Sequence, residues 1–184
     1  MAYNLAQKVS GNAKTVITDI DSLLTSKETV TLSLCNIHAT DSVSVDLYIA
    51  SQIGTDITDT GTDSNEADNA ITTSSVTLTV DGAAATSDIF ADEKVWKSDG
   101  TLFGTCTARN SNTEIVFGSG LSQVLANNDS LYTGVRYYIL KGVVIPVNTT
   151  LVLDKNELRM DPRDYLMYIK LGAADSAVDA ITRK

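Results

Sequence analysis

The sequence predicts an all-β fold, an antiparallel β-sandwich of the jelly-roll type that carries an inserted, small β-barrel-like module. Three observations predict this class. Apolar and polar residues alternate with period two along most of the chain. Ser and Thr are abundant in the alternating runs, as is typical of strand faces that meet water. Turn signals recur at intervals of about 8–12 residues, a spacing typical of sandwiches and barrels.

The clearest strands are expected at residues 29–36 and 42–49, with a hairpin-length connection between them. In the second run Val43, Val45 and Leu47 share one face, so that face is expected to be buried. An earlier strand is expected at residues 15–19. Further alternating runs predict strands at residues 75–80, 113–117, 134–140, 142–147, 150–153 and 165–171.

Helix signals are few. Leu121, Val124 and Leu125 have the i, i+3, i+4 spacing of one helical face, which predicts a short helix over residues 120–126. The polar residues 127–129 would end it. Residues 161–164 contain Pro162 and are expected to form a turn before the last long strand.

Residues 54–70 contain almost no apolar side chains and are expected to form a long exposed loop. The carboxylates in this loop do not follow the EF-hand pattern, and a solvated loop and an irregular Ca²⁺ site both remain open. They are Asp56, Asp59, Asp63, Glu66 and Asp68.

Two domains are expected, and the loop is the last part of the first segment of the outer one. Residues 1–70 and 133–184 would form the outer sandwich, and residues 71–132 would form the inserted module, because insertions are tolerated where the two chain ends lie close together. Asp-Gly turns at 81–82 and 99–100 mark hairpins inside the module. Trp96 and Phe103 flank the second turn and are expected to pack across its hairpin.

The charge is strongly acidic and unevenly distributed. The 184 residues have a formal net charge of −9. Residues 1–93 hold three Lys and fourteen Asp or Glu, whereas residues 94–184 hold eleven Lys or Arg and nine Asp or Glu. An acidic half argues against phosphate-backbone binding and against anionic membrane surfaces, so we expect no nucleic-acid or membrane partner. A solvated surface and an acidic face for a basic partner both remain open.

Recognisable catalytic and metal motifs are missing from the sequence. Its single imidazole, His38, is expected in a hairpin turn, and a hydrolase would need it in a cleft beside a Ser and a carboxylate. No GxSxG, GxxxxGK[ST] or GxGxxG pattern occurs. Cys35 and Cys106 are far apart with no CxxC, which excludes a recognisable zinc motif and leaves a disulfide open. We therefore expect a non-enzymatic protein with no cofactor and no metal.

Aromatic residues give the candidate interface, because Tyr and Trp are enriched where proteins meet. The alternative is that they are ordinary strand aromatics. A carbohydrate-binding module would need a platform of Trp and Tyr on one face, and the chain has one Trp. The five candidates are Tyr137, Tyr138, Tyr165, Tyr168 and Trp96.

Two long segments carry a family resemblance. Residues 30–49 (VTLSLCNIHATDSVSVDLYI) contain a strand, an Asn-x-His turn and a returning strand. Residues 137–153 (YYILKGVVIPVNTTLVL) contain the pattern YYILK, followed by an Ile-Pro pair and then by TLVL. Together they resemble the small β-sandwich virion proteins of tailed bacteriophages, especially those of marine myoviruses that infect cyanobacteria. Residues 95–104, 114–117 and 128–132 look like a small β-barrel addition seen in phage structural proteins.

The resemblance implies a structural role without catalytic residues. It implies a subunit on the exterior of the virion, made in the host cytoplasm: a capsid decoration, a head fibre, or a neck, tail or baseplate accessory. Its partners would be other virion proteins such as capsid, neck or tail subunits, together with further copies of itself in a homo-oligomer. A carbohydrate- or surface-binding β-sandwich module is the alternative, and a hydrolase built on His38 ranks third.

Overall fold

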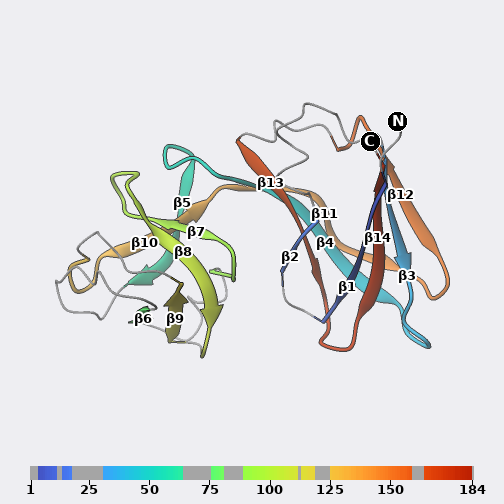
Figure 1. Cartoon of the computed structure of the whole chain (residues 1–184), viewed down its shortest axis with the longest axis horizontal. Helices are drawn as coiled ribbons and strands as arrows, with labels where there is room; N and C mark the ends of the chain where they lie inside the picture. The colour runs from blue at the N-terminus through green and yellow to red at the C-terminus, as the bar shows by residue number, and fades with distance from the viewer. Residues whose placement is uncertain are drawn as a thin grey trace. The chain divides into compact units, whose positions relative to one another are not determined.

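The computed structural model describes residues 4–11, 14–17, 31–63, 76–80, 89–111, 113–118, 125–158 and 164–183. Every regular element in these ranges is a β-strand, and the strands form antiparallel sheets (Figure 1). The predicted all-β antiparallel class is therefore confirmed. No helix in the described ranges is long and apolar enough to span a membrane. The chain divides into unit 1 (Met1–Ala50 with Arg136–Lys184) and unit 2 (Ser51–Val135).

Unit 1 is a sandwich of two four-stranded sheets. The first sheet has the order β1 (Asn4–Ser10), β14 (Ala177–Arg183), β3 (Thr31–Asn36), β12 (Thr150–Asp154). The second has the order β11 (Arg136–Ile145), β4 (Val43–Ser51), β13 (Tyr165–Leu171), β2 (Thr15–Val16). Each sheet presents one apolar face to the other, as sandwich packing requires.

The strand pairing of unit 1 is nested, as in a jelly roll. β1 pairs with β14, β2 with β13, β3 with β12, and β4 with β11. The chain of this unit is thus one long antiparallel hairpin that has rolled up into two sheets. The tip of the hairpin lies between β4 and β11, where Ala50 pairs with Arg136. Unit 2 is inserted at this tip, and the adjacent strand ends explain how a whole unit can leave and return there.

Apolar residues at alternate positions of the strands form the core of unit 1. In β3, Leu32 and Leu34 are fully buried and the residues between them are half-exposed; in β4, Val43, Val45 and Leu47 behave in the same way. Each such side chain contributes about 1.5–3 kcal/mol on burial. The other buried members of this core are Val9, Ile17, Ile145, Leu153, Leu158, Met167, Ile169, Leu171, Val178 and Ala180.

Unit 2 contains one six-stranded sheet with its own core. The order is β5 (Ile57–Asp63), β10 (Ser130–Gly134), β7 (Lys94–Trp96), β8 (Leu102–Arg109), β9 (Glu114–Phe117), β6 (Val76–Thr79). Phe103 meets Phe117 edge to face at 5.2 Å between ring centres. The remaining core residues are Leu78, Val80, Ile89, Val95, Cys106, Ile115, Leu125 and Leu131.

The expected barrel-like module is not what the described part of unit 2 forms. A barrel closes when its first and last strands pair. Here β5 pairs only with β10, and β6 only with β9, so the sheet has two open edges within the described ranges. Trp96 and Phe103 do lie on one hairpin, β7–β8, but Phe103 takes Phe117 of β9 as its ring partner.

Two expectations about residues 54–70 are corrected. Residues 57–63 form strand β5 instead of a loop, and Thr133 pairs with Thr58, which places β5 in unit 2. The boundary therefore falls at residues 50–51 and not at 70–71. Thr favours extended backbone, and an edge strand can remain polar, so a segment with one apolar residue can still pair. Residues 64–70 lie outside the described ranges.

The other strand predictions need smaller changes. The strands expected at 134–140 and 142–147 are one strand, β11, interrupted by register shifts on both sides of Leu140. Gly142, with a φ of 62°, absorbs the second shift as a bulge residue without ending the strand. Only residues 15–16 of the expected strand 15–19 are assigned as β2, while residues 18–19 and most of the expected helix 120–126 lie outside the described ranges. β1, β10 and β14 were not predicted as strands, and β7 and β8 were expected only as the two sides of the hairpin around residues 99–100.

Candidate interaction surface

Four of the five predicted interface residues lie in the second sheet of unit 1. Tyr137 and Tyr138 are on β11, and Tyr165 and Tyr168 are on β13. β4 lies between these strands and contributes Tyr48, which the sequence analysis did not single out. The sheet therefore brings five tyrosines from three neighbouring strands into one region.

Three of these tyrosines form a ladder on the face of the sheet that points away from the core. Tyr138 and Tyr48 are paired residues on β11 and β4, with ring centres 5.3 Å apart. Tyr48 and Tyr168 stack at 5.6 Å with an angle of 25° between the rings. We call Tyr138, Tyr48 and Tyr168 the tyrosine ladder. Tyr48 follows Leu47, a core residue, so the alternation of the strand turns its ring to the opposite face.

Cationic side chains surround the ladder. Lys14 Nζ lies 3.9 Å from the ring centre of Tyr168, and Lys141 Nζ lies 4.8 Å from that of Tyr138. The Arg136 guanidinium carbon is 5.9 Å from the ring centre of Tyr48. Cations over aromatic rings contribute about 0.5–2 kcal/mol each, depending on how dry the site is. The region is therefore both aromatic and locally positive.

Tyr137 points to the other face of the sheet, because neighbouring residues of a strand alternate in direction. Its ring meets that of Tyr165 nearly edge to face, with centres 5.9 Å apart. Tyr137 is 48% exposed and Tyr138 is 44% exposed. The two exposed rings thus lie back to back across β11 and do not form one flat platform.

Exposed apolar side chains concentrate on two edge strands of unit 1. In the described ranges six large hydrophobic residues are exposed, and four of them lie on β11 and β12: Tyr137, Tyr138, Val144 and Val152. β11 ends the second sheet and β12 ends the first. We call Tyr137, Tyr138, Lys141 and Val144 the β11 patch. Exposed apolar residues that gather on one strand mark an interaction site more often than isolated ones do.

The remaining predicted interface residues do not add exposed surface. Trp96 is 3% exposed, in unit 2, and its indole lies against Gly54, where an added Cβ would collide with the Gly100 carbonyl and touch the ring. Tyr168 is fully buried. Trp96 is therefore a core residue of unit 2. Tyr168 is the buried end of the ladder and stacks on Tyr48.

His38 lies in the β3–β4 turn beside two carboxylates. Its Nδ1 is 3.7 Å from Asp41 Oδ2, and its Nε2 is 3.9 Å from Asp175 Oδ2. These three groups are close enough to hold a metal ion. Nδ1, however, accepts the backbone N–H groups of Asp41 at 2.9 Å and Thr40 at 3.4 Å.

This hydrogen bonding decides how the imidazole can be used. A nitrogen that accepts N–H groups carries no proton, so the neutral ring carries its proton on Nε2, toward Asp175. A metal at Nε2 would require the proton to move to Nδ1, where it would oppose the two backbone donors. In the described part of the chain the ring nitrogens face carboxylates and backbone N–H groups, without the Ser that the hydrolase hypothesis needs.

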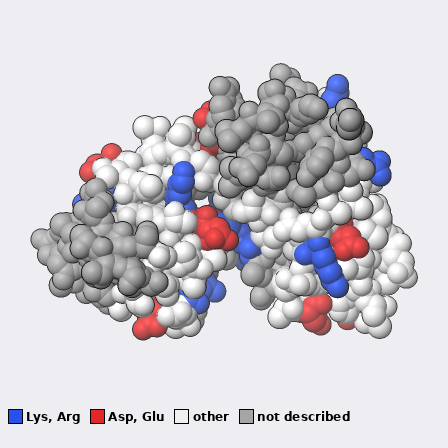
Figure 2. Space-filling view, viewed as in Figure 1, with Lys and Arg blue, Asp and Glu red and all other residues white. Residues whose placement is uncertain are grey.

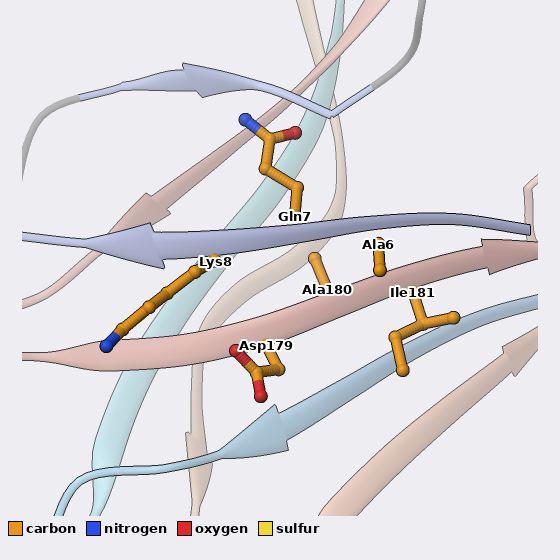
Figure 3. Close-up of a pocket in the computed structure, with 6 residues that line it drawn as sticks. All are labelled: Ala6, Gln7, Lys8, Asp179, Ala180 and Ile181. Atoms are coloured by element: carbon orange, nitrogen blue, oxygen red, sulfur yellow. The ribbon is translucent and has the colours of Figure 1, made fainter.

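Unit 1 and unit 2 each contain one cysteine thiol, and unit 1 has a surface hollow. Cys35 and Cys106 are both free, so the disulfide left open by the sequence does not form. A hollow runs along β1 and β14, with Ala6, Lys8, Asp179 and Ile181 among its lining residues (Figure 3). Figure 3 shows Gln7 on the opposite side of β1 from Lys8, so the polar groups do not converge on one point. This geometry does not form a ligand site.

The whole formal net charge of the chain is carried by the residues of unit 2. Unit 1 contains eleven Lys or Arg and eleven Asp or Glu, so its net charge is zero. Unit 2 contains three Lys or Arg and twelve Asp or Glu, so its net charge is −9. On the face shown in Figure 2 the described acidic and basic side chains are scattered, and neither sign gathers into one large patch. A division of charge between two units of one chain favours contacts between unlike surfaces.

Comparison of the chain with protein families, with curated proteins and with solved structures gives no match.

Proposed function

We propose that this chain is a non-enzymatic structural component of a tailed-phage virion, placed on the exterior of the particle. The β11 patch carries the proposal. A jelly-roll sandwich that exposes Tyr137, Tyr138 and Val144 on an edge strand offers a preformed surface for another subunit. The phage assignment itself comes from the resemblance of residues 30–49 and 137–153.

The alternatives receive less support from the geometry. A carbohydrate-binding module stacks sugar rings on a flat aromatic platform, whereas the two exposed tyrosines lie back to back and Trp96 is buried. A hydrolase based on His38 needs a nucleophile beside the imidazole. The contacts of His38 instead stabilise its own turn.

Labelling of intact particles tests the proposal. Antibodies raised against the purified chain are applied, with gold-labelled secondary antibodies, to purified virions of the source phage and examined by electron microscopy. We expect label at defined positions on the particle surface, and none with pre-immune serum. Detection of the chain only in the soluble fraction of the lysed host, with unlabelled virions, would contradict the proposal.

A second arm tests the role of the patch. A phage that encodes Tyr137→Ser with Tyr138→Ser is expected to release particles that lack the chain, because the change removes the exposed aromatic contact area of β11. Val152→Ser, a change at an exposed apolar residue of β12, is the control outside the patch. Normal incorporation of the double variant would show that the chain docks through another surface.

A further inference from the structure

We infer that the chain binds a second copy of itself head to tail, with the β11 patch of one copy against the acidic surface of unit 2 of the next. The inference rests on the proposed function, because it names the partner of the same patch. The occupant is argued from charge: a neutral unit that carries a cationic, aromatic patch is linked to a unit of net charge −9.

The patch has the chemistry to receive an acidic surface. Lys141 is exposed in the middle of the patch, between Tyr138 and Val144. Arg136 lies over the ring of Tyr48 and Lys14 lies over the ring of Tyr168, so both cations contact the part of the ladder behind Tyr138. The neighbouring carboxylate of Asp46 accepts the Gly142 N–H at 2.7 Å and is thereby already hydrogen-bonded. Apolar contact at the tyrosines and attraction at the lysine would act together.

Unit 2 supplies exposed carboxylates on more than one loop and strand. Asp59 lies on the edge strand β5, and Asp99 lies in the β7–β8 turn; both are exposed. Asp59 Oδ1 accepts the Gly61 N–H at 2.8 Å, and Asp99 Oδ1 accepts the Thr101 N–H at 2.9 Å. Each carboxylate is held in place by a hydrogen bond within its own turn.

The charge division also selects the symmetry of the contact. A two-fold contact of patch with patch would bring the Lys141 side chains of the two copies together. Their like charges would oppose this contact. A patch that meets unit 2 of the next copy pairs opposite charges at every interface. Such a heterologous contact closes into a ring or continues as a filament, depending on the rotation between copies.

Sedimentation velocity of the purified protein tests this inference. At about 50 mM NaCl the mass is expected to rise above the 19.6 kDa monomer with protein concentration, and at about 500 mM it is expected to return toward the monomer, since salt screens exposed charges. Lys141→Glu is expected to weaken association by about tenfold or more. Lys155→Glu makes the same charge change outside the patch and should leave association unchanged.

Variants of unit 2 separate the head-to-tail contact from a two-fold one. Asp59→Asn and Asp99→Asn each keep the oxygen that accepts its turn N–H, so the fold is retained, and a combination of both should weaken association. An unchanged association constant would overturn the head-to-tail contact. A monomer at low salt throughout the accessible concentration range would overturn self-association altogether. Either failure would leave the virion-labelling result unaffected, which distinguishes this inference from the proposed function.

Discussion

One buried asparagine ties the two sheets of unit 1 together. Asn36 is 1% exposed at the end of β3 in the first sheet. Its Nδ2 donates to the carbonyl of Ile145 at 2.9 Å, at the end of β11 in the second sheet, and to that of Asp41 at 3.0 Å. Its Oδ1 accepts the His38 N–H at 2.8 Å. A single amide thus joins the sheets and shapes the turn between β3 and β4.

Asn36→Ala is therefore expected to lower the free energy of unfolding of unit 1 by about 2–4 kcal/mol, because the buried carbonyl of Ile145 and two part-buried backbone groups of the turn lose their partner. Urea unfolding followed by tyrosine signals measures the loss. Asn36→Asp keeps the acceptor but places a carboxylate oxygen against two carbonyls, so it should be at least as destabilising. Asn110→Ala, at an exposed position, should change stability by less than about 0.5 kcal/mol. A mild effect of both Asn36 changes would show that water replaces the amide.

Asp99 offers a titration test of the β7–β8 turn. The backbone N–H and the hydroxyl of Thr101 hydrogen-bond the carboxylate and lower the pKa of Asp99 below its ordinary 3.8. A lowered pKa in the folded state means that the contribution to stability is present above 3.8 and is lost as the pH falls through the folded-state pKa. An NMR pH titration of the Asp99 carboxyl should show a midpoint below 3.8. Thr101→Val keeps only the backbone donor and should raise the midpoint of the Asp99 titration. An unchanged midpoint would show that the Thr101 hydroxyl does not lower the pKa.

At the scale of strands, two glycines show two different reasons for having no side chain. Gly142 has a φ of 62° at the bulge of β11, and an added Cβ would meet nothing within 4 Å. Gly134 ends β10, and there an added Cβ would collide with the carbonyl of Ser51. The first position needs a backbone conformation, whereas the second needs space.

Substitutions should separate these reasons. Gly142→Ala is expected to cost unit 1 about 1 kcal/mol, and Gly142→Asn less, because Asn tolerates left-handed backbone. Gly134→Ala is expected to cost unit 2 about 1–3 kcal/mol, and Gly134→Asn should offer no relief, because the collision is steric. Urea unfolding of the four variants measures both series. Equal losses for Gly142→Ala and Gly142→Asn would show that left-handed tolerance plays no part there.

The strands that could be predicted are those whose inward residues are large. β3, β4, β12 and β13 carry Leu, Val or Ile at alternate buried positions, and each lies within a predicted run. β14 was not predicted as a strand because its inward residues give only a weak alternation of apolar and polar side chains. These residues are Val178, Ala180 and Thr182. The nested pairing of β1 with β14 could not be read from any window, because it joins the two ends of the chain.

Part of the candidate site could also be predicted from the strand pattern. Tyr137 and Tyr138 were recognised as a pair of aromatics in a strand, and the structure exposes both. Tyr48 was missed, although it is out of phase with Val43, Val45 and Leu47. A large aromatic residue on the face that alternation assigns to water is the signal that could have found the ladder. The burial of Trp96 follows from contacts with Gly54 on a distant segment, which no local pattern contains.

At the scale of the whole molecule, the two units differ in core as well as in charge. The buried residues of unit 1 and those of unit 2 form separate clusters. The chain passes between the units at residues 50–51 and 135–136, and the Ser51 N–H donates to the Val135 carbonyl at 3.0 Å, so the two ends of unit 2 meet. Separate cores with few chain crossings permit separate unfolding.

The single Trp and the distribution of Tyr allow this separation to be measured. Trp96 is in unit 2, whereas six of the seven tyrosines belong to unit 1. Leu34→Ala removes a fully buried side chain from the core of unit 1, and Ile115→Ala does so in unit 2, each at a cost of about 2–5 kcal/mol. Leu34→Ala should shift the tyrosine-detected urea transition and leave the Trp96 fluorescence transition in place, and Ile115→Ala should do the reverse. If both variants instead shift one common transition by the same amount, the two units unfold as a single cooperative body. The two chain connections at the tip of the hairpin would then be enough to couple the unfolding of the two separate cores.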